Sequence, residues 1–322
     1  MNRYDVIIIG AGPAGLSLAY ELINEGKILI IEAKKEPHKQ IACAEWVPKL
    51  KVFAPYKISQ TDFMEILIGK EKIKKRFPGY VIDREKFQSS MLEGIKADIH
   101  TGERVLIVKK DIVMTTYSKY KAEWIVGAYG PYGPLSKHLS IHGFIPAINV
   151  RVALKKRLTH SIVYFDREIL YGYAWCFPRG NMANCGIGAK SRNLKVLLKK
   201  WLQFLSEHDY IDGLSYTNAH AGLIPTSILH KTNNPKHILI GDAGGFIDPL
   251  TGAGIASGIE SAKIAASLIK GTIKINEYKE YLEKSYLAKY LKRRRKRRDI
   301  MERKWNNLKE AIEKSWISSY QG

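Results

Sequence analysis

Apolar runs near the N-terminus occur in the order strand, helix, strand. Residues 4–9 (YDVIII) form a short β-branched run, residues 14–24 have helical spacing after a glycine turn, and residues 27–32 (KILIIE) form a second apolar run. Two strands joined by a helix within about thirty residues form the pattern of a βαβ unit. The pattern predicts an α/β fold.

The remaining pattern predicts mostly strands and then helices towards the C-terminus. Strands are expected at residues 103–108, 112–117 and 122–127, which would form a small antiparallel sheet feeding a strand, in several pieces of 147–188, and at 237–241. Helices are expected at residues 194–208, at about 253–270, and from 276 to the end. The last of these has an apolar face formed by Met301, Trp305, Leu308, Ile312 and Trp316.

The composition is that of a globular protein of one large or two joined domains. Of 322 residues, 45% are apolar and 10% aromatic, which is enough for a substantial core. The three cysteines form no CxxC pair, which argues against a disulfide framework or a zinc site and favours a reducing compartment. Without a leader pattern or a long apolar stretch, we expect a cytoplasmic protein with no transmembrane helix and no metal.

The charge changes this picture, because the net charge is +21 and is concentrated near the C-terminus. Residues 290–298 (YLKRRRKRR) hold seven cations in nine positions. Such a run is typical of a contact with anionic lipid, nucleic acid or a phosphorylated substrate. A solvated helix face in a lysine-rich protein is the alternative reading, and composition does not separate the two.

Candidate chemistry begins at the glycine turn after the first predicted strand. Gly10 allows a tight turn, Gly12 lets the backbone approach a pyrophosphate, and Gly15 permits close packing of helix on strand. Glu32 ends the second strand and would accept hydrogen bonds from an adenosine ribose. The residues that we expect to hold a dinucleotide here are Gly10, Gly12, Pro13, Ala14, Gly15, Glu32 and Ala33.

A second acidic glycine turn, residues 241–255 (GDAGGFIDPLTGAGI), again lies between a strand and a helix. Asp242 is placed to accept a hydrogen bond from a ribityl hydroxyl, and the helix N-terminus can face the charge on a reduced flavin. A simple nicotinamide dehydrogenase needs no such turn, so the two motifs together predict FAD. The expected ligands here are Gly241, Asp242, Pro249, Gly252, Gly254 and Ile255.

The two turns, together with residues 83–87 (DREKF), resemble the FAD-dependent group that includes aromatic hydroxylases and geranylgeranyl reductases. Residues 173–180 (YAWCFPRG), followed by 184–188 (NCGIG), are similar to the YxWxFP…GxG signature of the geranylgeranyl reductases. Residues 43–50 (CAEWVPKL) are similar to a CAEG-type segment of the archaeal digeranylgeranylglycerophospholipid reductases. The resemblance covers residues 1 to about 270.

The resemblance implies that reduced FAD delivers a hydride to isolated C=C bonds of polyprenyl chains and that a proton completes the saturation. It also implies a Rossmann-type FAD-binding domain interrupted by an antiparallel β-sheet substrate domain, with a C-terminal helical segment. We expect the FAD-binding domain at residues 1–60, 78–145 and 225–272, the substrate domain at 61–77 and 146–224, and the helical segment at 273–322.

The same resemblance implies roles for individual residues. Cys43, Tyr173 and Trp175 are the expected catalytic residues, and Cys43, Ala44 and Arg84 are expected near the cofactor. An ordinary packing role remains open for each, because free cysteines and aromatic strands are common in cores. The residues expected to line an apolar substrate channel are Trp46, Tyr173, Trp175, Phe177 and Pro178.

The chain departs from the resembling family at three positions. Tyr129 stands where the family has an aspartate in a GADG-type turn, and Ala42 stands where it has an arginine before the cysteine. Trp46 replaces a small residue, so a large ring would narrow the cavity. We therefore expect the substrate to differ from that of the family where Ala42 and Trp46 lie, whereas Tyr129 removes a carboxylate from its turn.

The leading hypothesis is a reductase of isoprenoid double bonds in membrane lipids or their precursors, held on the inner face of the cell membrane. The basic segment 289–305 would contact the anionic membrane surface. A flavin monooxygenase is the alternative enzyme, and a flavoprotein that binds nucleic acid through the arginine run is the alternative of another class. Because there is no second GxGxxG unit, ferredoxin and NAD(P)H both stand as candidate electron donors.

Overall fold

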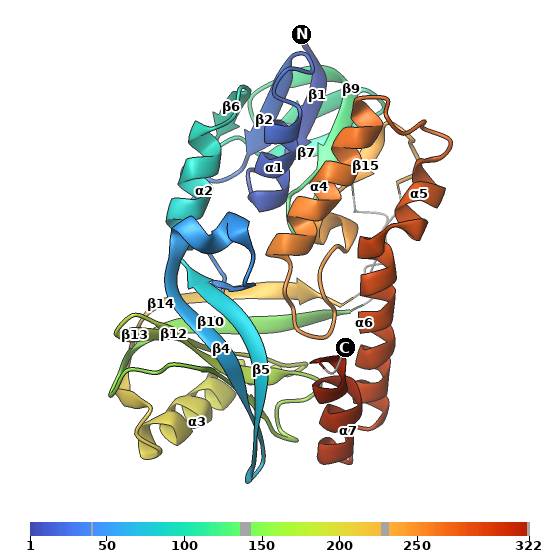
Figure 1. Cartoon of the computed structure of the whole chain (residues 1–322). Coiled ribbons are helices and arrows are strands. Elements are labelled where there is room, and N and C mark those ends of the chain that lie inside the picture. Colours follow the sequence, from blue (N-terminus) through green and yellow to red (C-terminus); the bar gives the residue numbers. More distant parts are fainter. Residues whose placement is uncertain (40, 136–142, 227–231, 321–322) are drawn as a thin grey trace. The chain divides into compact units, whose positions relative to one another are not determined.

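The computed structural model describes residues 1–39, 41–135, 143–226 and 232–320 (Figure 1). It divides into two compact units. Unit 1 comprises residues 1–39, 88–143 and 225–295, and unit 2 comprises residues 40–87, 144–224 and 296–322.

Unit 1 contains a seven-stranded sheet with the main order β6-β2-β1-β9-β8-β7. The strand β1 pairs in parallel with β2 and β9, and β15 pairs in parallel with the second half of β9. The hairpin partners β7 and β8 are antiparallel, as the sequence predicts. The strands are β1 (Asn2–Ile9), β2 (Ile28–Glu32), β6 (Asp98–Thr101), β7 (Val105–Lys109), β8 (Ile112–Thr115), β9 (Lys119–Gly127) and β15 (His237–Leu239).

The apolar run of β1 is continuous because both faces of this strand are buried. Val6 and Ile8 face a cluster built from α1 (Pro13–Glu21) and α4 (Ile255–Ile269), while Ile7 and Ile9 face the β7–β9 side. Figure 1 shows α1 and α4 beside each other over the sheet. The βαβ unit and the α/β fold that the sequence predicts are confirmed. Unit 1 also contains η2 (Gly241–Gly244), α5 (Tyr278–Lys284) and most of α2 (Arg84–Glu93).

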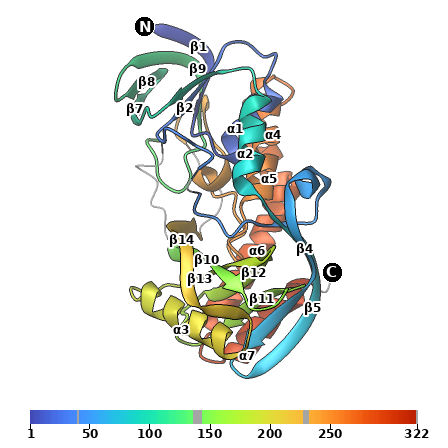
Figure 2. The ribbon, with the colours of Figure 1, turned by 90° about the vertical axis from the view of Figure 1, so that its left-hand side faces the viewer.

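Unit 2 contains an eight-stranded sheet with the order β14-β10-β13-β12-β11-β4-β5-β3. The predicted antiparallel arrangement holds for most pairs, whereas β4 and β11 are parallel. Figure 2 shows β4 and β5 as one long hairpin, which the sequence pattern did not predict. The strands are β3 (Trp46–Pro48), β4 (Lys57–Ile68), β5 (Glu71–Ile82), β10 (Phe144–Leu154), β11 (Ser161–Phe165), β12 (Tyr173–Arg179), β13 (Met182–Gly188) and β14 (Ile211–Pro225).

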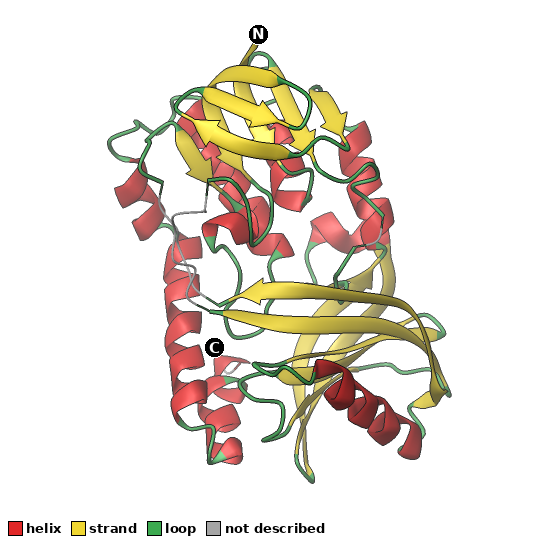
Figure 3. Cartoon of the chain, turned by 180° about the vertical axis from the view of Figure 1, so that it is seen from behind, coloured by secondary structure: helices red, strands yellow, loops and turns green. Residues whose placement is uncertain are grey.

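One face of this sheet is covered by α3 (Leu194–Glu207), as Figure 3 shows from behind. The helix forms because its apolar residues recur at helical spacing, and it buries Leu198, Trp201 and Leu205 against Cys176 and Cys185. These two cysteines face each other across β12 and β13 and are buried, so they serve packing. Unit 2 also contains η1 (Lys51–Tyr56), α7 (Leu308–Ser315), η3 (Ile317–Tyr320) and the end of α6 (Tyr286–Arg303).

The helical C-terminal segment is confirmed, but its aromatic face is not available to a membrane interface. Met301, Trp305 and Trp316 are each at most 5% exposed. Trp316 packs edge-on against Phe165 and Tyr173, with ring centroids 5.1 and 4.9 Å apart. The aromatic face therefore belongs to the core of unit 2.

The two compact units differ from the expected domain boundaries. Residues 40–60, 78–87 and 144–145 group with unit 2, whereas we expected them in the FAD-binding domain. The expected separate segment 273–322 divides after Arg295, within α6. The assignment of unit 1 to the cofactor and of unit 2 to the substrate stays a prediction.

Candidate functional site

The first candidate site in unit 1 is the turn between β1 and α1. Gly10 has a φ of +109°, which L side chains rarely adopt, and a Cβ there would lie 2.5 Å from the Ala128 carbonyl oxygen. A Cβ on Gly15 would lie 2.1 Å from the carbonyl oxygen of Gly10. A Cβ on Gly12 would meet nothing within 4 Å. Packing therefore demands two of these glycines, and the third leaves a bare backbone that a ligand can approach.

The N-terminus of α1 is open at this turn. The helix begins at Pro13, and Gly12 provides no side-chain cap, so the first-turn N–H groups can bind an anion. Ala14 lies under the second candidate turn, because a Cβ on Gly241 would be 2.9 Å from the Ala14 Cβ. The two predicted turns are thus in contact within unit 1.

Glu32 is fixed beside the first turn by backbone hydrogen bonds. Its carboxylate accepts from the N–H groups of Ala11 and Lys34, at 2.8 Å each. The next residue, Ala33, is exposed. A carboxylate held at the end of the second strand is the acceptor that a ribose needs in a βαβ nucleotide site.

Sheet pairing explains why the two turns meet. Ile9 at the end of β1 and Leu239 at the end of β15 both pair with Gly127, from opposite sides of β9. The carboxyl ends of parallel strands lie at one edge of a sheet, where α/β proteins bind their ligands. Turns far apart in sequence therefore open at the same edge.

Asp242 is the charged residue of the second turn. A Cβ on Gly254, at the start of α4, would lie 2.9 Å from its Oδ1 atom. Burial raises the pKa of Asp242 to about 6. Within the ranges that the structure describes, no group donates a hydrogen bond to this carboxylate, which leaves an acceptor ready for a hydroxyl group.

The rest of the second turn is held by Asp248, which the sequence analysis did not single out. Asp248 is 2% exposed, and its carboxylate accepts from Arg294 Nε at 2.8 Å, from Tyr290 Oη at 3.0 Å and from Leu250 N at 2.9 Å. No local pattern marks this pairing, because 46 residues separate Asp248 from Arg294. The other predicted residues are the buried Pro249, Gly252 with a φ of +73°, Gly254 as N-cap of α4, and Ile255 as its first residue.

The arginine run of α6 is therefore only partly a surface. Arg294 and Arg298 are 6% and 4% exposed, and Arg298 pairs with Glu302 at 2.6 Å. Arg295 donates to the Thr226 carbonyl oxygen, and Arg297 to Ser318 Oγ. The exposed cations of the run, with the preceding Lys289, are Lys289, Lys292, Arg293 and Lys296.

The second candidate site, in unit 2, is the segment that carries Cys43. Cys43 is half-buried, and its Sγ accepts from Glu45 N at 3.2 Å. Glu45 is a non-glycine residue with a φ of +61°, which costs about 1 kcal/mol or more and persists only where contacts enforce it. The conformation of this segment is therefore imposed by its surroundings.

Those contacts come from three strands of the unit 2 sheet. The Glu45 carboxylate, 4% exposed, pairs with Arg151 Nη2 of β10 at 3.0 Å and with Arg179 Nε of β12 at 2.7 Å. It also accepts from Asn184 Nδ2 of β13 at 2.8 Å, and the same amide group donates to the Ala44 carbonyl oxygen at 3.0 Å. These partners of Glu45 could not be identified from the sequence, because they lie 106, 134 and 139 residues away.

Arg84 lies beside the same segment. It is 4% exposed, and burial lowers the pKa of its guanidinium, an effect opposed by the neighbouring Cys43 and Glu45. Its side chain is within hydrogen-bonding reach of Cys43. A guanidinium held next to a thiol favours the thiolate form of that thiol.

The predicted substrate residues of β12 form part of an aromatic row. Tyr173, Trp175 and Phe177 alternate along the strand on the face opposite α3, with successive ring centroids 5.8 and 6.4 Å apart. Trp46 continues the row, with its ring 6.3 Å from Phe177. Pro178 lies on the other face, because it is adjacent to Phe177 in the strand and pairs with Ala183 of the α3-covered core.

Two of the three residues that differ from the resembling family, Trp46 and Tyr129, pack against neighbouring residues. Trp46 stacks on Phe77, with centroids 4.9 Å apart, and lies over Gly79, where a Cβ would be 2.2 Å from its ring. Tyr129, in unit 1, lies against Gly127 and Gly133, where added Cβ atoms would be 2.6 and 2.2 Å away. Each large ring therefore occupies space that a glycine leaves.

The fold and the paired turns are the pattern that the sequence predicts for an FAD-dependent oxidoreductase, and comparison with known proteins supports this class. The profile of the pyridine nucleotide-disulphide oxidoreductase family matches residues 7–151, which include the first turn. Curated relatives are named digeranylgeranylglycerophospholipid reductase. The chain is 24% identical to that of Methanocaldococcus jannaschii, over 99% of this chain and 92% of the relative. It is 27% identical to digeranylgeranylglycerophospholipid reductase 3 of Methanosphaera stadtmanae, over 94% and 87%.

Solved structures share the fold. A geranylgeranyl bacteriochlorophyll reductase-like protein from Thermoplasma acidophilum has a TM-score of 0.78 at 22% identity, covering 98% of this chain and 97% of that chain. PqsL of Pseudomonas aeruginosa, described as a probable FAD-dependent monooxygenase, has a TM-score of 0.73 at 14% identity, covering 97% and 99%. The predicted resemblance to the geranylgeranyl reductases is confirmed.

Proposed function

We propose that this chain is an FAD-dependent reductase that saturates C=C bonds of geranylgeranyl chains in lipids or lipid precursors. The structural observation that carries the cofactor part is the carboxylate of Asp242, which has no donor in the described chain and stands in contact with a turn left bare at Gly12. The similarity to reductases named for geranylgeranyl lipids, over 99% of this chain, supports the substrate class.

The residues of unit 1 fit FAD in a definite order. Glu32 would accept from the adenosine ribose, and the N–H groups at the start of α1 would bind the pyrophosphate over Gly12. Asp242 would accept from a ribityl hydroxyl, and the N-terminus of α4 adds a partial positive charge near it.

When bound and reduced, FAD supplies a hydride to one carbon of the double bond. The other carbon needs a proton, and we assign this role to the Cys43 thiol. Arg84 stabilises the thiolate that the transfer leaves, since its guanidinium lies within hydrogen-bonding reach. The contacts of Glu45 keep the Cys43 backbone in one conformation. One hydride and one proton complete each saturation.

The aromatic row would bind the isoprenoid. Tyr173, Trp175, Phe177 and Trp46 present flat apolar surface along β12 and β3, which suits an unsaturated hydrocarbon chain. Trp175 is oriented by the hydrogen bond from its Nε1 to Asn149 Oδ1 at 2.9 Å, so the ring keeps a fixed plane.

The proposal is tested by incubating purified, chemically reduced protein with geranylgeranylated lipid and measuring the masses of the products by mass spectrometry. Mass gains in steps of two hydrogens are expected. A preparation that cannot be loaded with flavin would refute the cofactor assignment. Oxygen uptake with aromatic substrates, without saturation of the lipid, would instead favour the monooxygenase alternative.

We also propose that α6 contacts an anionic membrane surface through its exposed cations, not through its buried aromatic rings. Lys289, Lys292, Arg293 and Lys296 recur at helical spacing and are exposed. Each cation near such a surface contributes about 1 kcal/mol. Along the described helices, none is long and apolar enough to cross a membrane.

Vesicle binding tests the membrane proposal. Replacing Lys292, Arg293 and Lys296 with glutamine should weaken binding to anionic vesicles by about a hundredfold at low salt and leave neutral vesicles unaffected. The control removes the same charge from exposed residues around α3, namely Arg192, Lys195 and Lys199. Equal binding of both variants to anionic vesicles would contradict the proposal. If the protein binds nucleic acid more tightly than lipid, these cations form a nucleic-acid-binding surface instead.

A further inference from the structure

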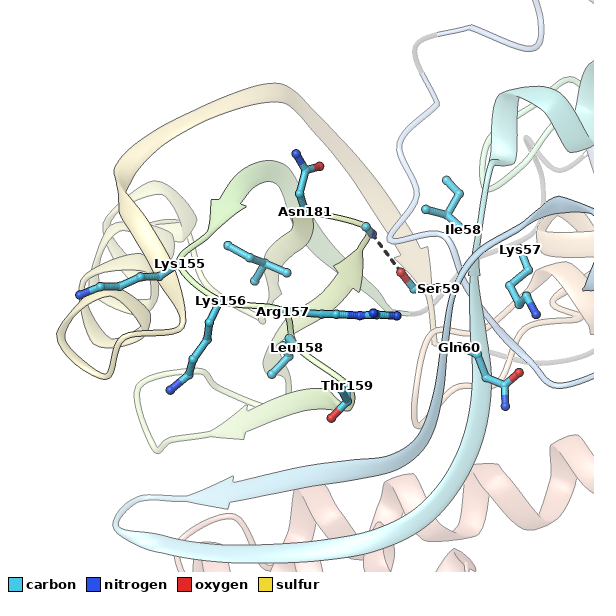
Figure 4. Close-up of a pocket in the computed structure, with 12 residues that line it drawn as sticks. Lys57, Ile58, Ser59, Gln60, Lys155, Lys156, Arg157, Leu158, Thr159 and Asn181 are labelled. Carbon is cyan, nitrogen blue, oxygen red and sulfur yellow. Dashed lines mark hydrogen bonds between the residues drawn. The ribbon is translucent and has the colours of Figure 1, made fainter.

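Unit 2 contains a cleft of about 640 Å³ that the predicted chemistry does not use (Figure 4). It is lined by the first residues of β4, the loop 154–159 after β10, and the turn at Gly180 and Asn181 between β12 and β13. The lining includes Lys57, Lys155, Lys156 and Arg157 but no aspartate or glutamate.

Two of these cations are engaged and two are not. Lys155 pairs with Asp209, outside the lining, and Lys57 Nζ lies 5.7 Å from the centre of the Tyr80 ring. Lys156 and Arg157 are both exposed. Lys156 acts on the Asp209 carboxylate only through its charge, without an ion pair, and Arg157 has no carboxylate partner in the described part of the chain. The cleft therefore keeps positive charge that the fold itself does not neutralise.

Arg157 is the cation that enters the cleft. Figure 4 shows its side chain extended towards Ser59 on β4, while Lys155 and Lys156 extend away from it. Ser59 Oγ accepts from Gly180 N at 2.9 Å, so its own hydroxyl hydrogen remains available as a donor. A guanidinium facing a hydroxyl donor across a cleft is suited to a tetrahedral oxyanion such as a phosphate group.

The position of the cleft connects it to the aromatic row. Gly180 follows Phe177 by three residues along the same strand and turn, which corresponds to about 10 Å of extended chain. Between them, Arg179 pairs with Glu45 at 2.7 Å, and the same carboxylate also pairs with Arg151 at 3.0 Å. An apolar row, an ion-pair cluster and a basic cleft succeed one another along β12, and this order matches a molecule with a hydrocarbon tail and an anionic head.

We propose that this cleft binds the phosphate group of a phosphorylated isoprenoid lipid, with Arg157 as the residue that determines this specificity. The inference rests on the proposed function for the tail and adds the recognition of the head. It distinguishes phosphorylated substrates from neutral prenyl alcohols, which present no group for Arg157.

Steady-state kinetics with Arg157→Gln tests the inference. For a geranylgeranylated glycerol phosphate, KM should rise about tenfold with little change in kcat, because one charge-assisted hydrogen-bond pair is lost in both ground and transition states. For uncharged geranylgeraniol, KM should not change. Arg192→Gln removes the same charge from an exposed position outside the cleft and should leave both substrates unaffected.

A binding measurement without catalysis separates this inference from the proposed function. Calorimetric titration of the unmodified protein with water-soluble glycerol phosphate should show binding that Arg157→Gln weakens about tenfold and Arg192→Gln does not. Inorganic phosphate should compete with the phosphorylated lipid but not with geranylgeraniol. Tighter binding of inorganic phosphate than of glycerol phosphate would mark the cleft as a site for the free ion and overturn the proposal, as would equal binding by the two variants. If no lipid is reduced by the unmodified protein, the proposed function fails, while the titration still decides on the cleft.

Discussion

The glycine turns of unit 1 and the Cys43 segment of unit 2 reach a fixed backbone in different ways. The turn at Gly10–Gly15 is set by residues within it, since Gly10 and Gly15 are each required by neighbouring backbone. The Cys43 segment is set from outside, because Glu45 is held at a φ of +61° by side chains of three strands. Local sequence therefore determines the first, and tertiary contacts determine the second.

This comparison predicts the largest loss of stability at Glu45. Glu45→Ala should lower the free energy of unfolding by about 4 kcal/mol, because it leaves Arg151 and Arg179 without their carboxylate in a buried setting. Urea unfolding measures the change. Asp62→Ala removes an exposed carboxylate from the same unit, whose contact with Lys49 is 3.6 Å, and should change stability little. Similar losses for the two variants would mean that the buried network does not hold the segment.

The next effect separates two glycines of one turn. Gly15→Ala should destabilise unit 1 by about 3 kcal/mol, since its Cβ would meet a backbone oxygen at 2.1 Å. Gly12→Ala should leave the thermal unfolding of flavin-free protein unchanged, because nothing lies within 4 Å of the new methyl group, but it should weaken FAD binding. Thermal unfolding and flavin titration are the two measurements. Normal FAD affinity in Gly12→Ala would remove the pyrophosphate from this turn.

The raised pKa of Asp242 predicts how the stability of the flavin-free protein depends on pH. Its folded pKa is about 6 and its ordinary value 3.8, so the folded state holds the proton more tightly and flavin-free protein loses stability as pH rises between these values. Asp242→Asn should therefore gain about 2 kcal/mol at pH 7 and nothing below pH 4, while its FAD affinity falls. Urea unfolding at both pH values measures this. As a control, Lys121 lowers the pKa of the exposed Asp111 carboxyl, so Asp111→Asn should show no gain in stability at pH 7.

The sequence predicts the structural features that depend on residues close together in the chain. The βαβ unit, the alternation of Tyr173, Trp175 and Phe177, and the amphipathic helix at 194–208 all follow from periods of two or 3.6 residues. The partners of Glu45 lie 106 and 134 residues away, and no period links them. The arginine run shows the same limit, because only the fold determines which cations turn inward.

Replacing Cys43 should have the smallest effect on stability, and it tests most directly what the thiol does. Cys43→Ala should lower the free energy of unfolding by about 1 kcal/mol, since the half-exposed thiol accepts a 3.2 Å hydrogen bond from Glu45 N and lies within hydrogen-bonding reach of Arg84. In native protein, iodoacetamide should alkylate Cys43 and not the buried Cys176 and Cys185, where burial also raises the pKa of the Cys185 thiol. Mass mapping after alkylation reads this out. Because the variant keeps its fold, loss of lipid reduction with normal flavin content would identify the Cys43 thiol as the proton donor. Full activity would mean that Cys43 has only a packing role.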